Sequence, residues 1–148
     1  DELLLKPGRF TPDEHRRMQA HTTIGADTLI AIRRELGDDD LLDMSICIAL
    51  EHHERWDGTG YPLGIAGERI ALEARIVALV DVYDALTSWR VYKAAMSHEE
   101  AVAIITESSG SHFDPVIVGV FRSIEHEFDA VRMDMHGDAP SCPVVLAA

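Results

Sequence analysis

The chain has 148 residues, a length that suits one domain and is too short for two independent hydrophobic cores. Apolar residues make up 47% of it and charged residues 26%, which is the balance of a globular protein rather than a disordered one. Because 13 Lys and Arg stand against 26 Asp and Glu, the net charge is −13, and this acidity argues against binding to nucleic-acid polymers or to anionic membranes.

The first predicted helix spans residues 12–36. Thr11 is placed to cap its start, Pro12 suits its first turn, and Glu14 stands where a capping box needs an acidic side chain. Helical spacing of apolar and small residues then continues to Gly37, a residue type that often follows the end of a helix.

A second predicted helix follows three acidic residues at 38–40, which suit the positive end of a helix dipole. Residues 41–53 are apolar almost all round, so we expect this helix to be buried. Four glycines and Pro62 between residues 54 and 68 then predict a long irregular loop, and loops longer than about 12 residues are uncommon unless they have a function.

Three further helices are predicted, over about 72–89, 98–108 and 115–131. The second of these three begins at a capping box formed by Ser97 and Glu100. From residue 133 to residue 148 the helical period is lost, and we expect a tail. No segment alternates between apolar and polar residues as a strand does, so the predicted fold class is all-α.

Three imidazoles and one carboxylate point to metal chemistry. His52 and His53 are adjacent, and their side chains project about 100° apart, so each can serve one ion of a pair, or one can bind while the other orients it. His21 lies in mid-helix among small residues, and Asp81 lies in an otherwise apolar helix, where a buried carboxylate is costly unless it is paired or binds metal. Imidazole with carboxylate suits iron, manganese or zinc better than calcium.

Each of these residues also has an ordinary structural interpretation. A single His in an amphipathic helix is more often a core or surface residue than a ligand. Asp81 could instead cap a helix or pair with Arg75 or Arg90. From the residue pattern alone, the metal site and the structural interpretation both stay open.

The loop adds a family resemblance. The segment HHERWDGTGYP at 52–62 strongly resembles the signature of the HD-GYP family, bacterial phosphodiesterases of cyclic di-GMP. Further similarities follow in the same order: LLKPG at 4–8, HTTIGA at 21–26, RIVALVDVYDALTS at 75–88, RVYK at 90–93 and GSHFDP at 110–115. The resemblance covers about residues 1–122. It implies a helical bundle of the HD-domain type with a long glycine-rich GYP loop.

The resemblance also implies which residues form the site. It assigns His21, His52, His53 and Asp81 as ligands of two or three divalent transition-metal ions, most often iron or manganese. Asp84, one helical turn after Asp81, would support the ligands of the same ions.

Contacts to cyclic di-GMP are implied for another set of residues. Arg90 and Lys93 would contact the anionic ligand, and their spacing of three places them on one helical face, as suits either a phosphodiester or a solvated surface. Gly60, Tyr61 and Pro62 would shape the pocket for the nucleotide, although a glycine-rich segment can also be an ordinary turn.

The family's His-Asp dyad and the lysine after it are expected before residue 1, together with the N-terminal helices of the fold. We therefore expect a partial HD-GYP domain at 1–132, a tail at 133–148, and no catalytic residue within the chain itself. The parent protein would hydrolyse cyclic di-GMP, and the chain alone would be impaired. Missing helices would expose apolar faces around Leu42, Ile46 and Leu79, which predicts a homodimer.

A second hypothesis is a non-catalytic HD-GYP-like module that docks a signalling protein through the GYP loop. A third, a phosphohydrolase for another nucleotide, is weaker because the GYP loop is specific. The location that we expect is the cytoplasm, without a membrane span. This expectation rests on the sequence as given, in which no charged segment leads into an apolar one and no apolar run reaches about 18 residues. Cys47 and Cys142 make no disulfide framework.

Overall fold

The computed structural model describes residues 6, 8, 10–88 and 95–136. Within these residues five α-helices follow one another: α1 (Pro12–Leu36), α2 (Asp40–Glu51), α3 (Leu72–Thr87), α4 (His98–Glu107) and α5 (Pro115–His136). A single 3-10 turn, η1 (Gly67–Arg69), interrupts the long loop before α3. The described residues contain no strand, and the all-α prediction is confirmed.

Local signals at the helix ends are present as the sequence predicts. Thr11 Oγ1 accepts a hydrogen bond from Glu14 N, and the Glu14 carboxylate accepts one from Thr11 N at 2.7 Å. Gly37, at φ +94°, ends α1 in a conformation that glycine adopts without strain. Ser97 and Glu100 form the second capping box at the start of α4.

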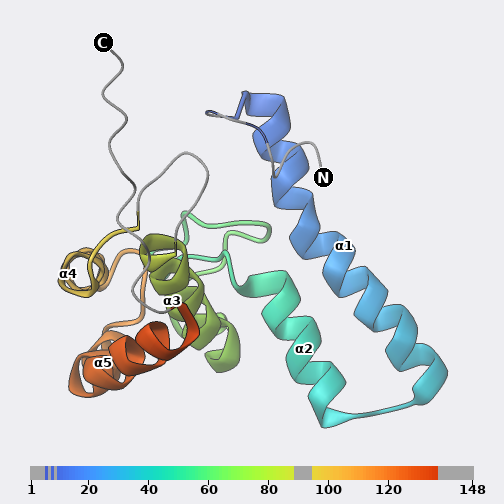
Figure 1. The fold of residues 1–148 in the computed structure, drawn as a ribbon. Coiled ribbons are helices and arrows are strands. Elements are labelled where there is room, and N and C mark those ends of the chain that lie inside the picture. Colours follow the sequence, from blue (N-terminus) through green and yellow to red (C-terminus); the bar gives the residue numbers. More distant parts are fainter. Residues whose placement is uncertain (1–5, 7, 9, 89–94, 137–148) are drawn as a thin grey trace.

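Helices pack in chain order, and this order places the site. In Figure 1, α1 and α2 form a long hairpin on one side, α3 lies in the middle, and α4 and α5 lie on the other side. The hydrophobic core lies among the last three helices and is built around Leu79, Tyr83, Ile105, Phe113 and Phe121. The hairpin of α1 and α2 therefore stands outside the main core and meets it where α2 packs on α3 and where the loop after α2 is bonded to the segment before α5.

Two helix predictions need correction. The expectation that the second helix is buried is wrong, because α2 contacts α1 and α3 but leaves another side open, with Leu41 70% exposed. The last helix is longer than predicted and ends at His136, so residues 133–136 are not a tail. No glycine or proline interrupts that turn, and an ion pair between Arg132 and Asp129 supports it. The rest of the predicted tail lies outside the described residues.

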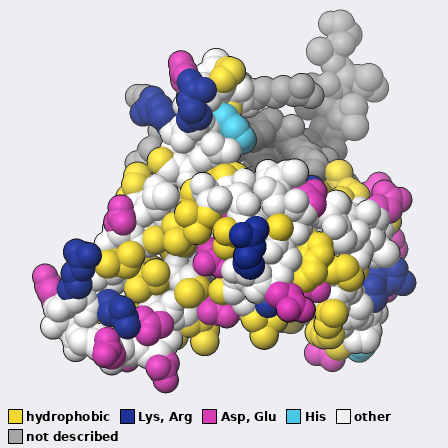
Figure 2. Space-filling view, turned by 180° about the vertical axis from the view of Figure 1, so that it is seen from behind, with side chains coloured by type: hydrophobic (Ala, Val, Ile, Leu, Met, Phe, Trp, Pro, Cys, Tyr) yellow, Lys and Arg dark blue, Asp and Glu magenta, His cyan; other side chains and the backbone are white. Residues whose placement is uncertain are grey.

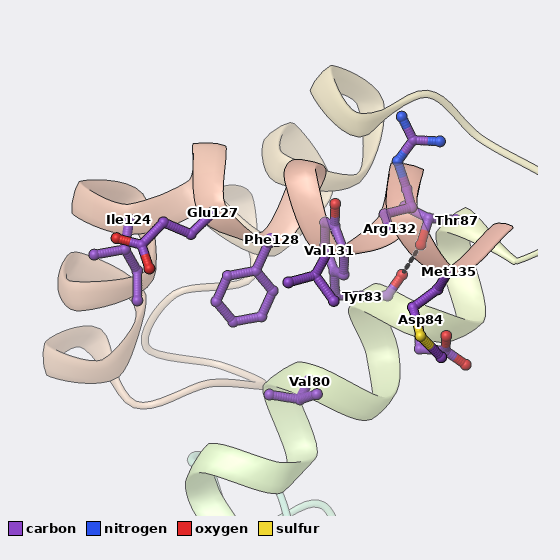
Figure 3. Close-up of a pocket in the computed structure, with 10 residues that line it drawn as sticks. All are labelled: Val80, Tyr83, Asp84, Thr87, Ile124, Glu127, Phe128, Val131, Arg132 and Met135. Atoms are coloured by element: carbon purple, nitrogen blue, oxygen red, sulfur yellow. Dashed lines mark hydrogen bonds between the residues drawn. The ribbon is translucent and has the colours of Figure 1, made fainter. Parts of the chain in front are cut away.

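An apolar groove runs between α3 and α5. Two adjoining cavities of about 380 and 290 Å³ share Val80, Ile124 and Phe128 as lining residues. Figure 3 shows these three side chains together in the larger cavity, and Figure 2 shows hydrophobic side chains spread among charged ones over the back of the molecule. Leu79, predicted to be uncovered, is instead buried beneath the α4 and α5 side of the core.

Leu42 and Ile46, predicted to be uncovered with Leu79, are partly buried. Exposed apolar side chains lie beside them on α2, where Leu41 is 70% and Met44 47% exposed, and also on α1, α3 and α5. Among the described residues, no helix combines the length and apolar character needed to cross a membrane.

Candidate metal site

Three histidines from two helices meet at one point. His21 lies in the middle of α1, His52 is the residue that ends α2, and His53 follows it. One nitrogen of each ring lies within 4.8 Å of the others, although 31 residues separate His21 from His52. This grouping confirms that the first three predicted ligands come together in the fold.

Main-chain carbonyls set the orientation of two of these rings. His21 Nδ1 lies 2.6 Å from the carbonyl oxygen of Met18, and His52 Nδ1 lies 2.8 Å from that of Ile48. A carbonyl oxygen can only accept, so each Nδ1 carries a proton, and in a neutral ring Nε2 is then the nitrogen that can bind a metal. The two Nε2 atoms stand 3.3 Å apart, close enough to share one cation.

The third ring is held in its neutral form. Burial, together with the neighbouring His52 and His21, lowers the pKa of His53 to about 4, although the charge of Asp81 acts in the opposite direction. A histidine must be neutral at the nitrogen that binds metal, so His53 meets this condition at neutral pH without losing a proton. The donor set therefore fits a borderline transition metal.

Asp81 differs from the sequence-based expectation. It is exposed rather than buried, and it lies outside the close group of three imidazoles. It still acts on that group, because its charge partly offsets the lowering of the His53 pKa and adds to the burial that raises the pKa of Tyr61. Arg75, one suggested partner for it, pairs with Asp114 instead, at 2.7 Å.

Asp84 accepts a hydrogen bond from Ser88 Oγ at 2.9 Å and lines the groove between α3 and α5. Arg90 and Lys93 lie outside the described residues. Their expected role toward the nucleotide stays a prediction.

The GYP loop folds back onto the histidines. The Tyr61 ring stacks on His53 with centroids 4.9 Å apart, and Tyr61 N donates to the His53 carbonyl at 3.2 Å. Gly60 is required here, because a Cβ on it would lie 2.3–2.6 Å from backbone atoms of Glu54 and Arg55. Pro62 lies exposed beyond this turn. The loop thus places an aromatic ring against a candidate ligand.

Two glutamates beside the histidine pair received no role from the sequence. Glu51 accepts a hydrogen bond from Ala71 N at 2.7 Å and so ties the end of α2 to the start of α3. Glu54 is 2% exposed and accepts from backbone groups of the GYP loop. Their position next to His52 and His53 is the sequence signal that could have found them.

Comparison with known proteins identifies the family to which the chain belongs. Residues 1–117 match the HD domain family, so the chain belongs to that family. It is 52% identical over 131 residues to a cyclic di-GMP phosphodiesterase of Vibrio cholerae serotype O1, a match that covers 88% of this chain and 27% of that protein. A probable cyclic di-GMP phosphodiesterase of the same organism is 50% identical over 129 residues, covering 86% of this chain and 29% of that protein.

A third relative from that organism, 3'3'-cGAMP-specific phosphodiesterase 2, is 35% identical over 135 residues, covering 91% of this chain and 25% of that protein. The chain thus spans well under half the length of these relatives. Together the matches confirm the resemblance to HD-GYP phosphodiesterases.

His112 provides a test of the electrostatics beside the loop. Burial, assisted by Arg55, lowers the pKa of His112 to about 4, against about 6.5 in an unfolded chain. Between these two pH values the unfolded chain binds a proton at this histidine that the folded chain does not. The contribution of His112 to the free energy of unfolding is therefore fully present above about pH 6.5 and is lost as the pH drops toward 4. Because glutamine does not titrate, we expect the free energy of unfolding of His112→Gln to fall less than that of the wild type between about pH 6.5 and pH 4.

The measurement is the urea midpoint of the metal-free chain at about pH 7.5 and about pH 5. His15→Gln, at an exposed position on α1, is the matched control and should keep the wild-type difference between the two midpoints. An unchanged difference in His112→Gln would contradict the assignment.

Proposed function

We propose that the chain is part of a metal-dependent phosphodiesterase that hydrolyses cyclic di-GMP. One observation carries this proposal: His21 and His52, with rings held by main-chain carbonyls, bring their Nε2 atoms within 3.3 Å of each other, with His53 beside them. The names of the Vibrio relatives support the substrate.

His21, His52 and His53, with Asp81 approaching from α3, would hold two or three ions, for which iron or manganese suits the donors. When bound, the ions supply an activated water and take up the charge that develops on phosphate oxygens. The protein's own part is to keep His53 neutral and to hold the rings in place. Asp84 would support these ligands from the next turn of α3.

Tyr61, Gly60 and Pro62 would form the wall of the nucleotide pocket, because the GYP loop brings the Tyr61 ring to the edge of the histidine group. Arg90 and Lys93 would hold phosphate oxygens, as a planar fork and as a point charge. The His-Asp dyad expected before residue 1 would complete the site.

Hydrolysis by the full encoded protein tests this function. Loaded with manganese or iron, it is expected to convert cyclic di-GMP to a linear dinucleotide or to GMP. His52→Ala should lower kcat/KM at least about a hundredfold, on the order of 3 kcal/mol of transition-state stabilisation. His126→Ala, at an exposed position on α5, is the control and should stay at the wild-type value.

A protein that cleaves no cyclic dinucleotide would contradict the proposal. Preference for 3'3'-cGAMP, the substrate in the name of one relative, would keep the metal chemistry and overturn the choice of nucleotide.

A binding module is the second candidate function. The GYP loop exposes Pro62 and leaves Leu63 55% exposed, which offers a signalling protein a surface. For such a module, loss of His52 would leave partner binding intact. The cytoplasm remains the proposed location, with the free Cys47 as a reduced thiol.

A homodimer is also proposed, formed through the groove between α3 and α5. Val80 is 41% exposed and lines both cavities of the groove, so Val80→Glu should separate the two copies. Ile24→Glu, at a 63% exposed position on α1, is the control and should leave the dimer intact. Light scattering measures the mass, and a wild-type monomer at high concentration would contradict the proposal.

A further inference from the structure

Two charged side chains, the buried Glu54 and the partly buried Arg75, hold the GYP loop and are not candidate ligands. Glu54 follows the histidine pair and is 2% exposed, and the Arg75 side chain on α3 is 16% exposed. Buried charges are costly unless hydrogen-bonded and paired, so their positions need a structural reason.

Glu54 closes the turn that carries Tyr61. Its Oε1 accepts from Leu63 N at 2.6 Å and from Gly64 N at 3.1 Å. On the other side of the turn, Tyr61 N donates to the His53 carbonyl. The turn is therefore fastened at both ends to the consecutive residues His53 and Glu54, and the Tyr61 ring has little freedom to leave His53.

Arg75 stands where α3, the loop and the start of α5 meet. Its Nη1 donates to Asp114 at 2.7 Å, and its guanidinium carbon lies 5.8 Å from the centroid of the Trp56 ring. Trp56 N in turn donates to the His112 carbonyl at 3.0 Å, which ties the loop to the segment before α5. Arg75 thus contacts the GYP loop at Trp56 and the segment before α5 at Asp114.

One small cavity connects the two charges. Glu54 and Arg75 both line it, and its volume of about 10 Å³ leaves room for about one water molecule. Among the described residues, Glu54 Oε2 and Arg75 Nε are buried atoms without a hydrogen-bond partner. A water molecule between an acceptor and a donor of opposite charge would satisfy both.

We propose that Glu54 and Arg75 are positioning residues for Tyr61, joined by one water molecule held between the Glu54 carboxylate and the Arg75 guanidinium. Glu54 places the turn, and Arg75 with Asp114 anchors Glu54 to the helical core. The consequence for catalysis rests on the proposed function, since it assumes that Tyr61 faces the nucleotide.

Two variants of Glu54 separate the position of the acceptor from its charge. Glu54→Gln keeps an oxygen at the position of Oε1, whereas Glu54→Asp keeps the charge and withdraws the oxygen by one methylene. Hydrogen exchange at Leu63 N and Gly64 N in the chain should accelerate at least about tenfold in Glu54→Asp and stay within about threefold of the wild type in Glu54→Gln. Glu68→Gln, at an exposed position in the same loop, is the control.

If these two amides exchange at the same rate in Glu54→Asp as in the wild type, the proposal is overturned. Loss of their protection in Glu54→Gln would also overturn it. A crystal structure of the chain should show one water within hydrogen-bonding distance of Glu54 Oε2 and Arg75 Nε. A cavity without that water would overturn the link between the two residues.

In the full encoded protein, Glu54→Asp should raise the KM for cyclic di-GMP at least about tenfold while the content of bound manganese stays unchanged. Glu54→Gln should restore the KM to within about threefold of the wild type. Loss of manganese together with the rise in KM would overturn the positioning role. A wild type without activity would count against the proposed function alone, since the exchange measurement does not depend on it.

Discussion

Two hydrogen bonds from imidazole to main-chain carbonyl are the interaction on which the site depends. Met18 and Ile48 each supply a carbonyl oxygen to the Nδ1 of the histidine three or four residues later. Each bond lies within a single helix, so the ring orientation follows from the helix itself. The result is that His21 and His52 present Nε2 atoms 3.3 Å apart, an arrangement in which both can bind one cation.

Helix packing turns this local geometry into a shared site. α1 packs on α2 through small side chains, and Thr22 and Ala26 are buried. A Cβ placed on Gly25 would lie 3.7 Å from the Cβ of Ala49, so the two helices approach closely there. The close approach lets a residue in mid-helix reach one at a helix end. Because the hairpin stands outside the main core, the site is connected to α3 and α5 by the packing of α2 on α3 and by the GYP loop and its anchors.

The features that depend on neighbouring residues could be predicted from the sequence. The contacts between residues far apart in the chain could not. The Thr11 and Ser97 capping boxes depend on neighbouring residues and are present as predicted. The exposure of Asp81 and the pairing of Arg75 with a residue 39 positions away depend on how helices pack, which no spacing rule reveals. The histidine group was expected because of a family resemblance, since residue spacing alone left it open.

Metal binding by the chain is the most direct test of the central claim. In a calorimetric titration with manganese, the wild type should bind at least one ion, and His21→Ala and His52→Ala should each weaken the affinity at least about tenfold, because each removes one of the facing Nε2 atoms. His126→Ala should bind as the wild type does. Equal binding by all four proteins, or no binding by the wild type, would contradict the account.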